Sequence, residues 1–169
     1  MKLFLLGGLT ALLLTIIGTV AYLLLGFAEV RGDAPASGFE TALMRAAVHA
    51  AVRRHAPNVP DPVPPTDANL IAGGRAYLNQ CAGCHGTPDK QRGDSTGLYP
   101  PAPELPAVGT QYSAAQVFWV AKHGIRRTGM FANGTWDADS VLWPIATFIT
   151  RITDLPPAVR ESLATRPRH

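Results

Sequence analysis

The side chains most able to carry chemistry lie in the run Cys81-Ala82-Gly83-Cys84-His85. Two cysteines three positions apart, followed directly by a histidine, form the attachment motif of a c-type haem. Each thiol adds across one haem vinyl group, and the two-residue gap separates the sulfurs by about the distance between those vinyls. The imidazole of His85 then lies under the iron as its proximal ligand. Because the chain holds two cysteines, the motif predicts one covalently attached haem c.

A Cys-x-x-Cys pair has three other uses. A structural zinc site needs four ligands, but the chain has no cysteine besides Cys81 and Cys84. A dithiol redox motif opens a helix in a βαβ unit, whereas a helix and no strand is predicted before Cys81. A disulfide between residues three apart would close a very small loop and constrain little of the chain. Haem attachment is the interpretation that also uses His85.

Iron held by His85 needs a sixth ligand or an open site, and this choice separates an electron carrier from a catalyst. The candidate ligands are thioethers and imidazoles, at Met44, Met130, His49, His55, His123 and His169. Met130 lies in a loop between two predicted helices, and the glycine beside it permits close approach to a bulky cofactor. A methionine in a small apolar domain is, however, more often a core side chain.

The chain around the motif predicts helices and loops. Gly73, Tyr77 and Cys81 recur every four residues, which places them on one face of a helix that begins with Asp67 as its N-cap. Glycine and proline dominate residues 87–110 and predict a loop. In that loop a carbonyl of Pro100 or Pro101 is positioned to accept the second ring N–H of His85.

Two further helices follow the loop. Ser113 and Gln116 form a capping box that opens a helix, and His123-Gly124 closes it. The last long helix is predicted over about 141–153, with Pro144 in its first turn. The polar tail has a short helix predicted over 157–164.

The N-terminal residues 3–28 carry no charged side chain. That stretch is long enough to cross a bilayer, and longer than the apolar core of a cleavable signal peptide. We therefore expect an uncleaved transmembrane anchor, with a signal peptide as the alternative. Lys2 favours a cytoplasmic N-terminus, which leaves the rest of the chain on the periplasmic side.

Residues 31–66 predict a juxtamembrane helix and a linker. Ser37 and Glu40 form a capping box before an alanine-rich helix that ends at His55. Its apolar stripe is expected to pack inward and consists of Phe39, Leu43, Ala46, Ala47 and Ala50. The opposite basic face, formed by Arg45, His49 and Arg53, either contacts lipid headgroups or a partner or is solvated. Residues 56–66 hold five prolines and predict an extended segment, either a spacer or an arm that wraps around the domain.

Residues 67–156 resemble a class I c-type cytochrome of the bacterial, membrane-anchored, monohaem kind. The resemblance is carried by Gly73-x-x-x-Tyr77-x-x-x-Cys81-Ala-Gly-Cys84-His85-Gly86, Pro100-Pro101, Lys122-His123-Gly124-Ile125, Thr128-Gly129-Met130 and the segment from Trp143 to Ile152. It implies an all-α cytochrome c fold, with three to five helices around a covalent haem and with Met130 as the distal iron ligand. It also implies that the helices of Gly73 and Trp143 cross at right angles. Members of this family usually follow that methionine with proline, where this chain has Phe131.

The resemblance implies a transfer of single electrons, because a histidine and a methionine together leave iron with no vacancy for substrate. The expected haem-pocket residues are Tyr77, Pro100, Pro101, Trp119 and Trp143, with Leu98, Phe118 and Phe131 as further apolar walls. The expected domains are the anchor (1–30), the juxtamembrane helix and linker (31–66), the haem domain (67–156) and a polar tail (157–169).

The expected function is that of an electron carrier rather than an enzyme, on the periplasmic side of the cytoplasmic membrane. Its partners would be redox proteins, namely a quinol-oxidising complex, an oxidase or a dehydrogenase. The alternatives are a fixed subunit of a larger membrane oxidoreductase complex, and a haem sensor or peroxidase with an open sixth site. The net charge of +3 is scattered, which argues against nucleic-acid binding. The basic residues near the haem segments either steer an acidic partner, pair with haem propionates or are solvated: Lys90, Arg92, Lys122, Arg126 and Arg127.

Overall fold

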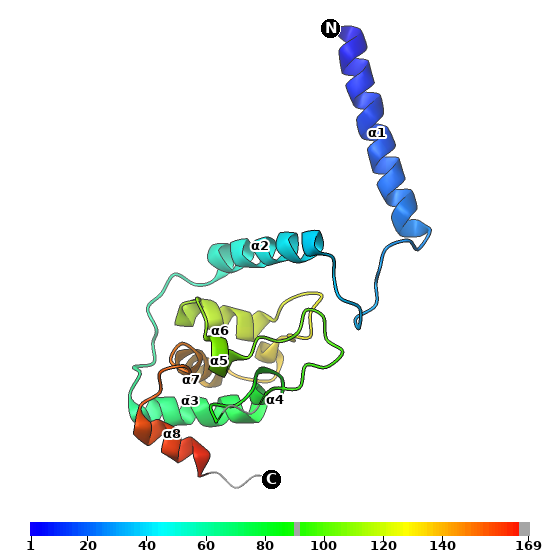
Figure 1. Cartoon of the computed structure of the whole chain (residues 1–169). Coiled ribbons are helices and arrows are strands. Elements are labelled where there is room, and N and C mark those ends of the chain that lie inside the picture. The colour runs from blue at the N-terminus through cyan, green and yellow to red at the C-terminus, as the bar shows by residue number, and fades with distance from the viewer. Residues whose placement is uncertain (90–91, 166–169) are drawn as a thin grey trace. The chain divides into compact units, whose positions relative to one another are not determined.

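The computed structural model describes residues 1–89 and 92–165, and in these residues it contains helices and no strand (Figure 1). The all-α prediction is therefore confirmed. The elements are α1 (Lys2–Leu24), α2 (Gly38–His55), α3 (Asp67–Gln80), α4 (Ala82–His85), α5 (Leu105–Val108), α6 (Ala114–His123), the 3₁₀ turn η1 (Asn133–Thr135), α7 (Asp139–Ile149) and α8 (Pro157–Ala164).

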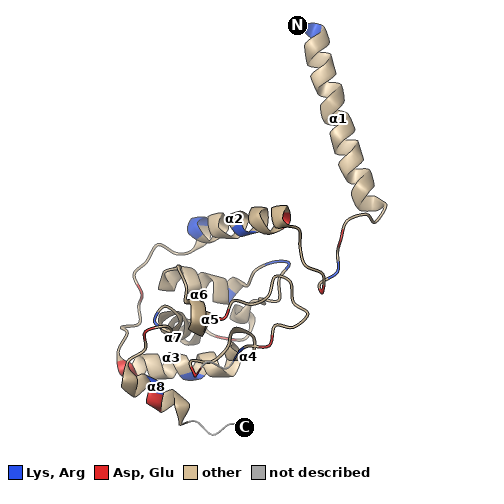
Figure 2. Cartoon of the chain, viewed as in Figure 1, with Lys and Arg blue, Asp and Glu red and all other residues tan. Residues whose placement is uncertain are grey.

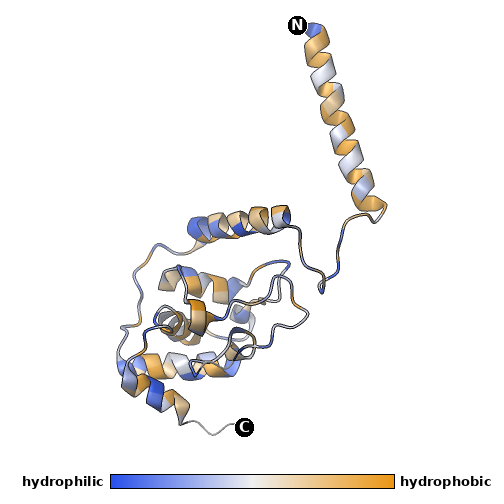
Figure 3. Ribbon diagram, viewed as in Figure 1, coloured by the Kyte–Doolittle hydropathy of each residue, from blue (hydrophilic) through white to orange (hydrophobic). Residues whose placement is uncertain are grey.

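The chain divides into two units, and the first is Met1–Ala34. Its helix α1 is apolar along almost its whole length, as Figure 3 shows, and has 23 residues. At 1.5 Å per residue this helix is about 35 Å long, which is sufficient to cross the hydrocarbon core of a bilayer. Helix α1 is thus consistent with the predicted membrane anchor.

The second unit starts at Pro35, and its core is built where α3 crosses α7. In Figure 1 α3 runs across the view while α7 points along it. The crossing is close because Gly73 has no side chain: a Cβ atom there would stand 2.1 Å from the carbonyl oxygen of Pro144. Helix α6 packs against α7 through stacked rings of Phe118 and Trp143, whose centroids are 4.2 Å apart.

Tyr77 fixes the end of α3 to the turn that carries the histidine of the haem motif. Its side chain is fully buried, and its hydroxyl donates a 2.7 Å hydrogen bond to the backbone carbonyl of Gly86, directly after His85. Burial, with a smaller contribution from nearby Cys81, raises the pKa of the Tyr77 phenol far above its ordinary value. Tyr77 therefore remains a hydrogen-bond donor in neutral and moderately alkaline solution.

Two helix boundaries differ from those predicted. The N-cap of α3 is Thr66, whose hydroxyl accepts the N–H of Asn69 at 3.3 Å, and Asp67 is the first helical residue. An acidic residue is favourable there because the helix dipole is positive at that end. Helix α7 begins at Asp139, so Pro144 lies inside the helix rather than in its first turn.

Residues 35–66 pack on the haem domain, which favours the wrapping arm over the spacer for the proline-rich segment. The Asp61 carboxylate accepts the Thr147 hydroxyl of α7 at 2.8 and 3.0 Å. A 2.6 Å hydrogen bond joins the Tyr112 hydroxyl to Nδ1 of His49 on α2, and Val52 of the same helix is fully buried. The prolines therefore hold the segment along the domain surface.

The predicted packing face of α2 is wrong. The side that meets the haem domain carries Val52 and His49, and the apolar stripe faces outward, with Phe39 80% and Leu43 56% exposed. The sequence supports either face, because valines at positions 48 and 52 recur with the same helical spacing as the stripe.

We expect Gly73→Ala to destabilise the protein, because the new methyl group meets backbone atoms of Pro144 that have little freedom to move. Overpacking of this kind costs about 1–3 kcal/mol, and the stiffness of a backbone contact favours the upper end. The measurement is guanidinium unfolding of the haem-loaded protein. Gly38→Ala is the control, since a Cβ there meets nothing within 4 Å. An equal midpoint for the two variants would contradict the close crossing.

We expect Tyr77→Phe to lower the free energy of unfolding by about 1–3 kcal/mol, since it leaves the buried Gly86 carbonyl without its donor. Guanidinium unfolding again supplies the measurement. Tyr99→Phe removes a hydroxyl from a side chain that is 40% exposed, and should change stability little. A Tyr77→Phe protein as stable as the wild type would show that the hydrogen bond contributes nothing.

Candidate haem site

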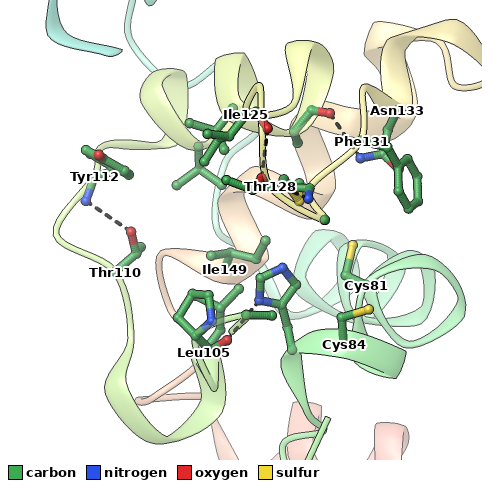
Figure 4. A pocket seen from close by; sticks show the side chains of 18 of the residues that line it. Cys81, Cys84, Leu105, Thr110, Tyr112, Ile125, Thr128, Phe131, Asn133 and Ile149 are labelled. Atoms are coloured by element: carbon green, nitrogen blue, oxygen red, sulfur yellow. Dashed lines mark hydrogen bonds between the residues drawn. The ribbon is translucent and has the colours of Figure 1, made fainter. Parts of the chain in front are cut away.

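A cavity of about 330 Å³ opens beside the Cys81–His85 motif. Figure 4 shows Cys81 and Cys84 on one side of it and Ile125 and Thr128 on another, with Ile149 between them. The lining is mainly apolar, and among the residues that the structure describes it includes no Asp, Glu, Lys or Arg side chain. Its apolar residues are Leu98, Pro100, Pro101, Ala102, Pro103, Leu105, Val117, Val120, Ala121, Ile125, Met130, Phe131, Ile145 and Ile149.

The two cysteines stand where α3 ends and α4 begins. Cys81 is the residue between the two helices, and its N–H donates to the Tyr77 carbonyl at 2.8 Å. Burial, aided by the charges of Asp137 and Cys84, raises the pKa of the Cys81 thiol to about 12. In a redox-active Cys-x-x-Cys pair the environment lowers a thiol pKa. The raised pKa of the Cys81 thiol therefore argues against a dithiol oxidoreductase.

The ring of His85 is oriented by a backbone carbonyl. Its Nδ1 lies 2.8 Å from the carbonyl oxygen of Pro103. Because a carbonyl only accepts, Nδ1 carries the proton, and the lone pair is on Nε2, which is the arrangement a metal-binding histidine needs. The prediction named Pro100 or Pro101. Those two residues line the cavity, but the carbonyl that meets His85 comes later in the same proline-rich loop.

Met130 is held by a closed turn that runs from Gly124. The Ile125 N–H donates to the Met130 carbonyl at 2.9 Å, and the Met130 N–H donates to the Thr128 hydroxyl at 3.0 Å. That hydroxyl in turn donates to the Ile125 carbonyl at 2.7 Å. The turn requires Gly124, which has a φ of +65° and whose Cβ would meet the Met130 carbonyl. Met130 and His85 thus line the same cavity from different elements.

The structure places two of the five expected pocket residues, Pro100 and Pro101, along the cavity. Tyr77 is buried in the core behind it, and Trp143 is stacked on Phe118. The Trp119 ring packs on the side away from the cavity, between His55 and His123. The further walls Leu98 and Phe131 line the cavity, and Phe118 is in the core.

Several residues that line the cavity were not predicted from the sequence. Ile145 and Ile149 come from α7, one helical turn apart, and Leu105 from α5. The four-residue spacing of the isoleucines could have indicated them. Asn133 also lines the cavity, and its side-chain amide donates to the Ala121 carbonyl at the end of α6. No sequence pattern indicated Asn133.

The other candidate ligands that the structure describes do not line the cavity. His49 is engaged with Tyr112, and Met44 is 40% exposed on α2. His55 and His123 pack against the Trp119 ring, as described above. His169 lies outside the described residues. Within 1–89 and 92–165 no three His, Cys, Asp or Glu side chains are grouped to hold a metal ion.

The expected basic cluster is smaller in the structure. Arg92 pairs with Glu104 at 2.8 Å, and Lys122 pairs with Asp139 at 2.7 Å. Arg126 and Arg127 are exposed in the loop before Met130, which Figure 2 shows in blue. Lys90 lies outside the described residues. Arg127 has a φ of +63°, which is uncommon for a residue with a side chain.

The donor set fits a haem. Two thiols adjoin an apolar cavity, an imidazole is fixed in the metal-binding tautomer, and a thioether faces the same cavity. Residues 68–149 match the family described as cytochrome c oxidase, cbb3-type, subunit III. No curated protein and no solved structure matches the chain significantly. The site and the family match, which implies haem c, lead to one conclusion: the chain contains a c-type cytochrome domain over residues 68–149.

Proposed function

We propose that the chain transfers single electrons through one haem c, attached to Cys81 and Cys84 and ligated by His85 and Met130. The observation that carries the proposal is that His85 and Met130 line one apolar cavity while backbone hydrogen bonds fix each of them separately. Bound haem supplies reversible one-electron chemistry at its iron. No open position is then left for a substrate, which disfavours the sensor and peroxidase alternatives.

The residues around the cavity influence the reduction potential of the bound haem. A methionine thioether favours the reduced iron and raises the reduction potential. Ile145, Ile149 and Val117 exclude water and so disfavour the extra positive charge of the oxidised state. The Pro103 carbonyl strengthens His85 as a donor because it accepts the Nδ1 proton.

The membrane anchor confines the carrier to the plane in which respiratory complexes lie. Haem c is attached outside the cytoplasm, so we place residues 35–169 on the periplasmic side and keep α1 as an uncleaved anchor. Because the proline-rich segment packs on the haem domain, the flexible connection is limited to the residues between α1 and Pro35. A short tether raises the effective concentration of nearby partners.

The partner's docking surface lies beside the cavity. Phe131 lines the cavity and is 55% exposed, and it meets the ring of Trp136, itself 73% exposed, edge to face at 5.5 Å. The next residue, Asp137, accepts a hydrogen bond from Gln80, beside the haem-attaching Cys81. Exposed aromatics flanked by Arg126 and Arg127 suit a redox protein with an acidic rim, within a respiratory or dehydrogenase complex.

We expect Met130→Ala to abolish the weak red absorption band that methionine sulfur gives on ferric haem. The iron should become high-spin, bind carbon monoxide without denaturant and show a lower reduction potential. Absorption spectra and a redox titration make the test. Met44→Ala removes a thioether outside the cavity and should leave all these properties unchanged. A wild-type ferric protein that is already high-spin would refute Met130 as ligand and favour the sensor or peroxidase interpretation.

We expect the double variant Arg126→Gln/Arg127→Gln to be oxidised by ferricyanide roughly tenfold more slowly at low ionic strength, because the positive field that attracts the anion is reduced. Stopped-flow traces should converge with those of the wild type at high salt. Arg75→Gln, which removes one exposed positive charge on α3, is the control. An unchanged rate together with a shifted reduction potential would instead show that the two arginines pair with haem propionates.

A further inference from the structure

The outward face of α2 is apolar although its side chains are exposed in the structure. Phe39 is 80% and Leu43 56% exposed, and Ala46, Ala47 and Ala50 continue the same face. These residues follow the i, i+4, i+7, i+8, i+11 spacing of one helix side. That side carries no charged residue from Phe39 to Ala50, over three turns, and Figure 3 shows orange and blue residues alternating along α2.

Helix α2 carries apolar residues on its outward side as well as on its inward side, unlike an ordinary surface helix. Its inward side holds His49, bonded to Tyr112, beside the buried Val52. A helix on a soluble domain normally turns its apolar stripe inward and its polar residues outward. The outward stripe of α2 therefore has the properties of a contact surface.

Basic residues border the end of this stripe. At 100° per residue, Arg54 continues the line of the stripe and Arg53 lies at its border, one turn beyond Ala50. Both are exposed, and the corresponding end of α2 is blue in Figure 2. An apolar stripe with flanking arginines is the pattern of a helix that lies in a membrane interface and binds anionic headgroups.

We propose that this face of α2 lies on the surface of the lipid bilayer that α1 enters. The inference rests on the membrane anchoring in the proposed function. Residues 25–37 join α1 to α2, and that connection reaches at most about 45 Å when fully extended. Phe39 and Leu43 insert between the headgroups, the alanines let the helix lie close, and the two arginines bind lipid phosphates.

This docking orients the haem domain. Helix α2 and the Cys81–His85 turn lie at opposite ends of the compact unit in Figure 1. Cys84 is exposed at the far end. A bilayer bound at α2 therefore leaves the cysteine side of the haem site directed toward water, where the aqueous domain of a redox partner can reach it.

The test uses spin labels on the full-length, haem-loaded protein in nanodiscs of phosphatidylcholine, with and without phosphatidylglycerol. In that protein the haem occupies both native cysteines, so Ala47→Cys places one label on the stripe and Arg45→Cys places one on the other side of α2. With phosphatidylglycerol we expect the label at 47 to be several-fold less accessible to a water-soluble nickel chelate, and more accessible to oxygen, than the label at 45. Phe39→Gln/Leu43→Gln should abolish this difference, and Met44→Gln should not.

Equal nickel accessibility of the two labels in both nanodiscs would overturn the proposal. Exclusion of nickel and oxygen together from position 47, in nanodiscs or in native membranes, would also overturn it, because a protein and not lipid then covers the stripe. The red absorption band, recorded on the same samples, reports Met130 ligation independently. Failure of the docking proposal is thereby distinguished from failure of the electron-transfer proposal.

Discussion

The close crossing of α3 and α7 at Gly73 is the constraint on which the rest of the haem domain depends. With backbone against backbone at Pro144, the two helices bring opposite ends of the domain sequence to one cavity. Helix α3 ends in Cys81, and α7 supplies the Ile145 and Ile149 walls. A larger residue at position 73 would separate the thiols from the apolar surface that receives the haem. The helix crossing therefore forms the cavity without any contribution from the cofactor. The Tyr77–Gly86 hydrogen bond in turn fixes the backbone next to His85.

His85 and Met130, the side chains that we propose as axial ligands, are held by loops that do not depend on each other. Pro103 fixes the ring of His85, while the turn from Gly124 fixes the backbone of Met130 through the Thr128 hydroxyl. Each loop contains its own hydrogen bonds, so a change in the charge of the iron does not require either loop to rearrange. That property suits electron transfer, in which any movement of ligands adds to the barrier. The Thr128 hydroxyl both donates and accepts within the turn, so this one side chain replaces the rigidity that a proline after the methionine usually supplies.

The sequence predicts well where a local pattern has one physical outcome. The capping box at Ser113 and the glycine stop at Gly124 are of this kind, and α6 has the expected bounds. The sequence predicts poorly where a side chain has several possible packing partners and the tertiary structure selects one of them. Trp119 was expected in the pocket as a large apolar residue, but its ring packs between His55 and His123. The carbonyl that meets His85 depends on the path of a whole proline-rich loop, which no single residue determines. The two sides of α2 are both plausible packing faces, and only the tertiary structure distinguishes them.

The elements outside residues 68–149 pack against the cytochrome domain and add contacts to its helices. Residues 68–149 contain the whole cavity lining, yet α8 covers α3 where Leu163 packs on Gly74, and Asp61 binds α7. Helix α2 is connected to the cavity itself, because its hydrogen-bond partner Tyr112 lines the cavity. Burial raises the pKa of the Tyr112 phenol, against an opposing effect of Arg53, so the hydroxyl stays available to His49. A side chain in the cavity wall is thus fixed to the helix whose outward face we assign to the bilayer. The arrangement makes the orientation of the haem site a property of the fold, and not of the tether that follows α1.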